Sequence, residues 1–464
     1  MTRIKTDICI IGAGSGGLSV AAGAVQMGAR VVLIEAHKMG GDCLNYGCVP
    51  SKALLAQAKA VAARGTAPTS ADFTRAMDHV AATIARIAPH DSVERFEGLG
   101  VQVLAGRGSF VGPDTVAVGD TRITARRFVI ATGSRALVPP IPGLESVPYM
   151  TNETLFAQTE CPGHLLIVGA GPIGLEMAQA HRRLGARVTV IDGAQALARD
   201  DAEAAAVVLA ALRRDGVEIV EGAQVERIGG RAGAIEVQVK GGTIFAGTHL
   251  LVATGRKPNT KGLGLENAGI AHTAAGIVVN AGLRSSNRRV YAIGDVAGQG
   301  QFTHLAGYHA GVIIRSMLFG LPARARADHI PHVTYTDPEL AQIGLTEDEA
   351  RRKYGGQLGV FRVGYDQIDR ALAEGRDAGF CKLMVVKGRP VGVTIVGAQA
   401  GEVIAPYALA MANRLKLSAI AGTVLPYPTL AEIGKRAAGA YFSPQLFDNL
   451  TVKRIVGLVQ RLLP

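Results

Sequence analysis

Two cysteines separated by four residues are the most reactive feature of this sequence. Cys43 and Cys48 lie in the segment GGDCLNYGCVPSK at residues 40–52. In a regular α-helix their Cα atoms would lie roughly 8.6 Å apart, whereas a disulfide tolerates about 6.8 Å at most. A bond between the two sulfurs therefore requires an irregular turn, which Asn45 and Gly47 between them permit.

The chain has five cysteines, and the other three give this pair no help in binding a metal. Two thiols are too few ligands for a metal site, and Cys9, Cys161 and Cys381 are far away in the sequence. Cys9 falls in an expected strand, where cysteine is usually a small buried apolar residue. We predict structural roles for these three cysteines, no metal site, and catalytic chemistry at the pair.

Composition is typical of a large globular enzyme. The chain has 464 residues, 48% hydrophobic and 19% charged, with a net charge of +11; we expect two to four domains. The cations are scattered and there is no Trp, which argues against a nucleic-acid partner. The opening MTRIKTDICIIGAG leads straight into an expected strand without room for a signal peptide, so we expect a cytoplasmic protein.

Two segments, residues 6–35 and 164–192, repeat one design of strand, glycine turn, helix, strand and final acid. Glycines at such a turn let the backbone approach a pyrophosphate at a helix N-terminus, and the acid accepts hydrogen bonds from a ribose. One such motif is weak evidence, but two predict that the chain binds two dinucleotides. The residues are Gly12, Gly14, Gly17 and Glu35 in the first segment and Gly169, Gly171, Gly174 and Asp192 in the second.

Shorter markers surround these segments. ATG follows an expected strand in RFVIATGSRALVPPIPGL and again in HLLVATGRKPNT, and VYAIGDVAG places Gly-Asp at a strand end. From His329 the composition becomes rich in β-hairpins, which predicts an α+β domain. The predicted fold class is α/β, with two Rossmann-like dinucleotide-binding domains and a C-terminal α+β dimerisation domain. The predicted boundaries are 1–150 and 276–328 for the first domain, 151–275 for the second and 329–464 for the third.

The segment GGDCLNYGCVPSK resembles the redox-disulfide signature of the FAD-dependent pyridine nucleotide–disulfide oxidoreductases, the family of dihydrolipoamide dehydrogenase, glutathione reductase and mercuric reductase. The motifs follow the family's order along essentially the whole chain. The resemblance implies an electron relay from NAD(P)H through FAD to a Cys43–Cys48 disulfide, in a homodimer. For FAD it implies binding by Gly12, Gly14, Gly17, Glu35, Gly41, Lys52, Gly108, Thr132, Gly133, Ser134, Asp295 and Ala306.

The same resemblance assigns the catalytic roles. Cys48 would face the flavin, Cys43 would exchange with substrate, and Lys52 would pair with Glu176 where hydride arrives. A lysine there stabilises anionic reduced flavin, and a carboxylate keeps the lysine in place. Binding of NAD(P) would involve Gly169, Gly171, Gly174, Asp192, Gly255 and Arg256. Asp192 favours NADH, because a 2′-phosphate would meet a carboxylate; the nearby Arg187 and Arg199 leave NADPH open.

The C-terminal region departs from dihydrolipoamide dehydrogenase and glutathione reductase, which carry His-Pro-x-x-x-Glu. There the partner subunit's histidine is the acid–base group for thiol–disulfide exchange. Here LPYPTLAE places Tyr427 in the histidine's position and keeps Glu432, and residues 333–464 contain no histidine. A phenol with a pKa of about 10 is a poor base near neutral pH. We therefore expect reduction of the pair to be intact and exchange with an ordinary disulfide to be slow.

Mercuric reductase also resembles this chain in the tyrosine and in YDQIDRALAEGRDAGFCKL, residues 365–383. It passes Hg(II) through a C-terminal cysteine pair, however, and residues 382–464 contain no cysteine. We therefore do not expect efficient mercury detoxification. The acceptor hypotheses are a disulfide, small or protein-bound, and alternatively a soft metal ion, quinone or other electrophile. A third hypothesis is a non-enzymatic docking subunit, against which the intact Lys52, Glu176 and cysteine pair argue.

The segment from Thr451 to the end alternates apolar residues with Lys453, Arg454 and Arg461. An amphipathic helix of this kind can lie on a membrane surface. The enzyme could then transfer electrons to a quinone in that membrane. About 12 residues with three cations bind lipid weakly, so we favour packing of this segment on the protein's own dimer.

Overall fold

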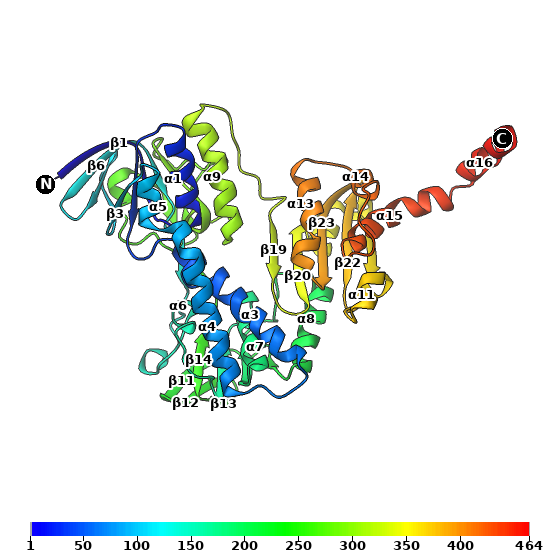
Figure 1. Ribbon diagram of the computed structural model, residues 1–464, viewed down its shortest axis with the longest axis horizontal. Helices are drawn as coiled ribbons and strands as arrows, with labels where there is room; N and C mark the ends of the chain where they lie inside the picture. The colour runs from blue at the N-terminus through cyan, green and yellow to red at the C-terminus, as the bar shows by residue number, and fades with distance from the viewer. Residues whose placement is uncertain (1, 464) are drawn as a thin grey trace. The chain divides into compact units, whose positions relative to one another are not determined.

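The computed structural model describes residues 2–463 and divides into two compact units. The N-terminal unit comprises Met1–Gly193 and Glu218–Arg326, and the C-terminal unit comprises Ala194–Val217 and Ala327–Pro464. Figure 1 shows the secondary structure of both. The expected domain boundaries, including the one at residue 329, stay a prediction. Among residues 2–463, no helix is both long and apolar enough to cross a membrane.

A seven-stranded sheet forms the first half of the N-terminal unit, with the order β3-β2-β1-β6-β5-β4 and β18 also paired with β6. The strands β3, β2, β1, β6 and β18 pair in parallel, and β4–β5–β6 is antiparallel. The strands are β1 (Thr2–Ile11), β2 (Val31–Glu35), β3 (Gln102–Ala105), β4 (Ser109–Gly112), β5 (Thr115–Val118), β6 (Thr121–Ile130) and β18 (Val290–Ala292).

A second, four-stranded parallel sheet has the order β10-β9-β8-β14, beside a three-stranded antiparallel sheet, β11-β12-β13, and a two-stranded ribbon, β15-β7. The bounds are β7 (Ser134–Ala136), β8 (His164–Val168), β9 (Arg187–Ile191), β10 (Glu218–Val220), β11 (Val225–Arg231), β12 (Ala234–Val239), β13 (Ile244–Gly247), β14 (His249–Val252) and β15 (Arg256–Pro258); a short pair joins β16 (His272–Thr273) and β17 (Gly276–Ile277).

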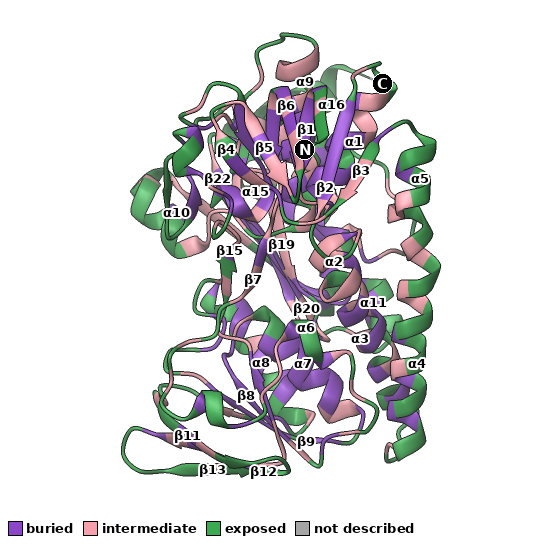
Figure 2. Ribbon diagram, turned by 90° about the vertical axis from the view of Figure 1, so that its left-hand side faces the viewer, coloured by how far each residue is buried: buried purple, intermediate pink, exposed green. Residues whose placement is uncertain are grey.

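In the N-terminal unit, α1 and α7 begin directly after the two glycine turns. Figure 2 shows that buried residues concentrate in central strands such as β6 and in α7. The helices are α1 (Ser15–Gln26), α2 (Gly41–Asn45), α3 (Cys48–Ala63), α4 (Ser70–Ile87), α5 (Val93–Gly98), α6 (Asn152–Leu155), α7 (Pro172–Arg183) and α9 (Thr303–Leu318). As predicted, ATG follows a strand twice, because β6 ends at Ile130 and β14 ends at Val252.

The C-terminal unit is built on a five-stranded antiparallel sheet with the order β19-β20-β23-β22-β21. The strands are β19 (Pro331–Thr334), β20 (Glu339–Gly344), β21 (Gly359–Gly364), β22 (Phe380–Val386) and β23 (Arg389–Gly397). The helices are α8 (Ala202–Arg214), α10 (Glu347–Tyr354), α11 (Asp369–Ala373), α12 (Ala400–Val403), α13 (Ala405–Ala412), α14 (Leu417–Ala421), α15 (Glu432–Phe447) and α16 (Leu450–Leu462).

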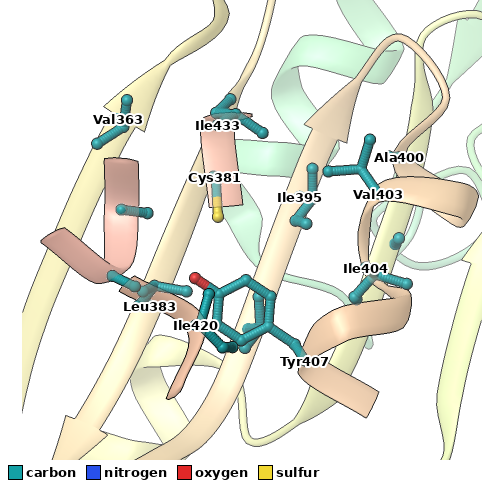
Figure 3. Close-up of a cluster of buried hydrophobic side chains, with 14 of the residues drawn as sticks. Val363, Cys381, Leu383, Ile395, Ala400, Val403, Ile404, Tyr407, Ile420 and Ile433 are labelled. Atoms are coloured by element: carbon teal, nitrogen blue, oxygen red, sulfur yellow. The ribbon is translucent and has the colours of Figure 1, made fainter. Parts of the chain in front are cut away.

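The core of the C-terminal unit packs Cys381 and Tyr407 between the sheet and its helices (Figure 3). The Tyr407 hydroxyl donates to the Gly434 carbonyl over 2.6 Å, so this buried phenol is satisfied. Burial raises the pKa of the Cys381 thiol, and Cys9 in β1 is in the same state. Both cysteines are fully buried, as the sequence indicated for Cys9.

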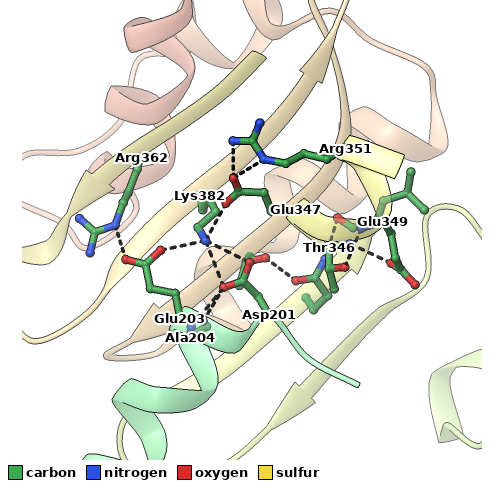
Figure 4. A network of polar contacts seen from close by, with 12 residues as sticks. Asp201, Glu203, Ala204, Thr346, Glu347, Glu349, Arg351, Arg362 and Lys382 are labelled. Atoms are coloured by element: carbon green, nitrogen blue, oxygen red, sulfur yellow. Dashed lines mark hydrogen bonds and ion pairs between the residues drawn. The ribbon is translucent and has the colours of Figure 1, made fainter. Parts of the chain in front are cut away.

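A buried lysine on β22 organises the polar side of the same sheet (Figure 4). Lys382 Nζ lies 2.8 Å from Glu203 Oε2 and 3.0 Å from Glu347 Oε2. It also lies 3.1 Å from Asp201 Oδ2, and Asp201 accepts backbone N–H groups at the start of α8. Burial alone would lower the pKa of Lys382, but these carboxylates raise it. One ammonium group thus ties α8 and α10 to the sheet.

Replacing Lys382 by Met should destabilise this unit, because three carboxylates would lose a buried cation. Breaking a buried ion pair from one side costs about 3–5 kcal/mol, and we expect a loss of about 3 kcal/mol in the free energy of unfolding, measured with urea. The matched control is Lys353→Met, since Lys353 is exposed on α10. A loss below about 1 kcal/mol for Lys382→Met would show that the carboxylates find other partners.

Candidate redox site

The two cysteines sit on either side of a break between helices. The short helix α2 ends at Asn45, and α3 begins at Cys48. A Cβ on Gly47 would lie 2.9 Å from Asp42 Oδ2 and 3.1 Å from Asp42 O, so a larger residue there would crowd Asp42. The irregular turn that a bond between these sulfurs requires is confirmed. The structure contains the pair as thiols, joined by a hydrogen bond.

The surroundings of Cys48 favour a thiolate. The hydrogen bond from Cys43 is the largest of the effects that lower the pKa of Cys48 to about 6, and the Thr303 hydroxyl and the Lys52 charge add to it against burial. Thr303 Oγ1 lies 3.3 Å from Cys48 Sγ. Cys48 and Thr303 are each the first residue of a 16-residue helix, and helix N-termini stabilise anions.

The surroundings of Cys43 favour the protonated thiol instead. The hydrogen bond to Cys48 raises the pKa of Cys43, and burial and the nearby Asp42 carboxylate raise it further. The reduced pair therefore divides into a thiolate at Cys48 and a thiol at Cys43. Such a pair holds one proton between two sulfurs, which is the state that donates electrons most readily without a separate base.

Lys52 and Glu176 form an ion pair, as the resemblance implied. Lys52 Nζ lies 2.8 Å from Glu176 Oε2. Glu176 is buried on α7, whereas the Lys52 side chain is about a third exposed, at 37%. Lys52 lies one helical turn after Cys48 on α3, so both face the same side of that helix. The carboxylate holds the ammonium group in place, and the ammonium charge acts on the Cys48 sulfur.

A second cluster contains Arg256, which the sequence analysis assigned to NAD(P). Its guanidinium donates to Ser134 Oγ over 2.8 Å and lies 3.0 Å from Asp42 Oδ2. Ser134 Oγ in turn donates to Asp295 Oδ2 over 2.5 Å. Burial raises the pKa of Asp295, against the effect of Ser134 and Arg256. Arg256 thus lies with Ser134 and Asp295, two residues expected at FAD, and connects them to the cysteine segment.

Three residues of this site were missed by the sequence analysis. Asp42 joins Arg256 to the cysteine turn, and Asn152 Nδ2 donates to Asp42 Oδ1 over 2.9 Å and to the Tyr46 carbonyl over 3.3 Å. Thr303 contacts Cys48 from 255 residues away. Only Asp42 had a usable signal, since it precedes Cys43 in the motif. Asn152 and Thr303 gave none, because polar residues at helix starts are common.

The first glycine turn leaves no room for a side chain at two of its three glycines. A Cβ on Gly12 would lie 2.4 Å from Ala131 O, and one on Gly17 would lie 1.9 Å from Gly12 O. Glu35 Oε2 accepts the Ala13 N–H over 2.6 Å, and Glu35 Oε1 accepts the His37 N–H over 2.8 Å. The acid at the end of β2 therefore also holds the turn that precedes α1.

The second turn has nearly the same close backbone contacts and the same carboxylate hydrogen bond as the first. A Cβ on Gly169 would lie 2.5 Å from Ala253 O, and one on Gly174 would lie 2.0 Å from Gly169 O. Asp192 Oδ2 accepts the Ala170 N–H over 2.7 Å. No atom lies within 4 Å of the position of a Cβ on Gly171. Each turn thus leaves glycine-lined space at the N-terminus of a helix, which fits a pyrophosphate.

The remaining residues expected at FAD lie around the first turn. Gly41 is left-handed and approaches Gly14, and Gly108 packs against side chains of β1 and β2. Thr132 and Gly133 follow β6, and the Thr132 hydroxyl donates to the Asn259 carbonyl over 2.8 Å. Ala306 is buried on α9. Gly255 is left-handed and follows β14 in the second half. The residues present therefore fit FAD at the first turn and a nicotinamide dinucleotide at the second.

Tyr427 and Glu432 lie in the C-terminal unit, where the tyrosine has a partner that the sequence did not reveal. The exposed Tyr427 hydroxyl donates to Asp369 Oδ2 over 2.7 Å. Among residues 2–463, Glu432 Oε2 has no hydrogen-bond partner although it is buried. The hydrogen bond and charge of Asp369 raise the pKa of Tyr427, and Glu432 adds to the effect. This phenol is therefore held in its neutral form.

The chain matches two family descriptions over most of its length. Residues 6–310 match the pyridine nucleotide-disulphide oxidoreductases, and residues 330–438 match the dimerisation domain of the same proteins. The chain therefore belongs to the pyridine nucleotide-disulphide oxidoreductases, enzymes that use FAD and NAD(P)H. The dimerisation domain supports a homodimer.

Similar proteins include reductases of metal ions and of disulfides. Mercuric reductase of Acidithiobacillus ferrooxidans is 35% identical over 459 residues, which are 94% of this chain and 83% of that protein. A Cu(II) complex of the HOCl-induced flavoprotein disulfide reductase RclA from Escherichia coli has 28% identity and a TM-score of 0.86, covering 94% of this chain and 99% of that one. LpdA from Mycobacterium tuberculosis has 25% identity and a TM-score of 0.86, covering 95% and 99%.

The lowered pKa of Cys48 predicts how the FAD-loaded enzyme responds to pH after reduction by NADH. Long-wavelength thiolate–flavin absorbance should persist above about pH 6 and disappear as the pH falls through that value, because the thiolate then takes up a proton. In Thr303→Val the midpoint should rise by about one pH unit, since a hydrogen bond to a charged group is lost.

Thr74→Val is the matched control, because Thr74 is exposed on α4, and it should leave the midpoint unchanged. A Cys48→Ser variant should lack the absorbance at every pH. A Thr303→Val midpoint equal to that of the parent enzyme would remove Thr303 from the stabilisation of the thiolate.

Proposed function

We propose that this chain reduces thiophilic metal ions, presented as small complexes, with electrons that pass from NAD(P)H to the pair Cys43 and Cys48. The observation that carries the proposal is the state of Tyr427. Its single hydroxyl proton is directed to Asp369 over 2.7 Å, and its pKa is raised. The group in the histidine's position is therefore a neutral oxygen acceptor and no proton-accepting base.

FAD bound at the first glycine turn would supply a carrier that takes hydride from NAD(P)H and passes two electrons to sulfur. The residues around that carrier have separate roles. Lys52, held by Glu176, provides a positive charge near the developing negative charge. Thr303 and the start of α3 keep Cys48 as a thiolate, so that the proton of the reduced pair stays on Cys43.

A soft metal ion is an acceptor that needs no base in the protein. When both sulfurs bind the ion, the metal replaces the thiol proton at Cys43, because a bound cation lowers the pKa of its thiol ligand. Oxidation of the pair, one thiolate and one thiol, to the disulfide releases two electrons and the single proton of Cys43, which passes to water as the metal replaces it. The two electrons reduce one Hg(II) to Hg(0) or, with a second ion, two Cu(II) to two Cu(I).

The similar proteins support this acceptor class. Mercuric reductase and the Cu(II) complex of RclA are both named for a thiophilic metal ion. Residues 382–464 contain no cysteine to deliver metal to the site, so the ion would have to arrive on a small carrier such as a low-molecular-weight thiol. We infer from this that turnover depends strongly on the ligands that the metal carries.

A second candidate is a disulfide whose leaving thiol is acidic. Such a thiol departs without protonation, and exchange then needs only the attacking thiol. The family supports this candidate. For either acceptor we propose a cleft shared with Tyr427 and Glu432 of the other subunit of the homodimer, and a cytoplasmic location, where dithiols are kept reduced.

Replacing Tyr427 by His distinguishes the two candidates. The variant should raise turnover of oxidised lipoamide by about tenfold or more, because a positioned base contributes about 10²–10⁴ to such a step. Turnover with Hg(II) or Cu(II) bound to a small thiol should stay within about twofold. NADH consumption measures both. Tyr427→Phe is the control, because it removes the hydroxyl and adds no base.

The proposal fails if the parent enzyme reduces lipoamide as fast as it reduces either metal complex. It also fails if neither metal ion is reduced in an enzyme whose FAD is reduced normally by NADH.

The Asp192 carboxylate predicts a preference for NADH. Asp192→Asn should lower the ratio of kcat/KM for NADH to that for NADPH by about tenfold, because a 2′-phosphate would no longer face a negative charge. Glu226→Gln on the exposed face of β11 removes the same charge at a distance and should leave the ratio unchanged. An unchanged ratio in Asp192→Asn would assign cofactor choice to other residues, such as Arg187.

A further inference from the structure

The chain ends in a separate amphipathic helix, α16 (Leu450–Leu462). Asn449 starts this helix by accepting the Thr451 and Val452 N–H groups over 3.0 and 3.3 Å. Within the described range Leu450–Leu462, no residue is buried. The large apolar side chains are 44–71% exposed at Ile455, Val456, Leu458, Val459 and Leu462. An exposed apolar face of this size on a capped helix indicates an interaction site for a partner outside its own unit.

From Val452 onward, the large side chains of α16 divide between two faces, whereas Leu450 in the first turn lies on the polar side. At 100° per residue, the apolar face comprises Val452, Ile455, Val456, Leu458, Val459 and Leu462. The opposite face carries Lys453, Arg454, Gln460 and Arg461. Residues 449–464 include three cations and no acidic residue. The helix therefore combines an apolar face with a polar face whose charged residues are all cations.

This charge pattern favours one kind of partner. A second copy of the chain is itself basic, with a net charge of +11, and offers no overall complement to three further cations. An anionic lipid surface does, because each nearby Lys or Arg is attracted to it while the apolar face enters the lipid boundary. The match to the dimerisation domain also ends at residue 438, before α16 begins.

We propose that α16 lies on an anionic lipid surface, with its apolar face in the lipid boundary and Lys453, Arg454 and Arg461 among the headgroups. The weakness of one short helix argued against lipid contact at the level of the sequence. A homodimer presents two such helices, and the second binds at high effective concentration once the first is bound. The proposal is independent of the electron acceptor.

The test is sedimentation of the full-length, FAD-loaded protein with vesicles. We expect pelleting with phosphatidylcholine vesicles that contain phosphatidylglycerol, little pelleting with phosphatidylcholine alone, and release at high salt. Val459→Asp should abolish pelleting. Gln460→Asp is the matched control, with the same charge change on the opposite face, and should weaken binding about fivefold, as for one lost attraction. NADH consumption should be unchanged in both variants.

Deletion of residues 450–464 separates the outcomes. Loss of pelleting with an intact dimer by light scattering supports the proposal. Pelleting that survives the deletion, or no pelleting of the parent protein, overturns it. Conversion of the dimer to a monomer also overturns it, and assigns α16 to the surface of a second copy.

Discussion

A thiolate at Cys48 is the charge around which the N-terminal unit is arranged. Its stability requires a hydrogen bond from Cys43, another from Thr303 and the nearby ammonium of Lys52. Each of these comes from a different element, and Lys52 is itself held by the buried Glu176 of α7. Gly47 suits the turn between the two cysteines, because a Cβ at this position would crowd Asp42.

Asp42 connects this charge to the rest of the unit. It lies next to Cys43 in the sequence and pairs with Arg256, which in turn contacts Ser134 and approaches Asp295. The cysteine turn is therefore tied directly to the residues expected at the first dinucleotide. A change in charge at the cysteine turn would therefore alter the electrostatic potential at these dinucleotide-binding residues, and the reverse also holds, because the largely buried arginine contacts both.

The C-terminal unit is also organised by charged and hydrogen-bonded side chains. Lys382 is buried among three carboxylates and joins two helices to the antiparallel sheet. In the same unit, Asp369 fixes the exposed Tyr427 as a neutral hydroxyl. The family position usually given to a base is thus occupied by a group that accepts hydrogen bonds, which restricts the acceptors that the enzyme can serve efficiently.

The sequence by itself determined the two glycine turns, the cysteine pair and the α+β character of the last domain, because these depend on local rules. Glycine is required where backbone atoms approach within 2–3 Å, as at Gly12 and Gly17, and acids at fixed spacing follow from the strand–turn–helix design. The ion pair of Lys52 and Glu176 was inferred only through resemblance, since 124 residues separate the partners.

Only the tertiary structure decided which polar groups meet across long stretches of chain. Thr303 at Cys48, Asn152 at Asp42, Arg256 at Asp295 and Asp369 at Tyr427 are all pairings that no spacing rule contains. Strand order and helix packing bring such residues together, and they depend on the whole core. The sequence therefore showed what chemistry is present, whereas the fold decided which sulfur carries the charge and which group holds the tyrosine.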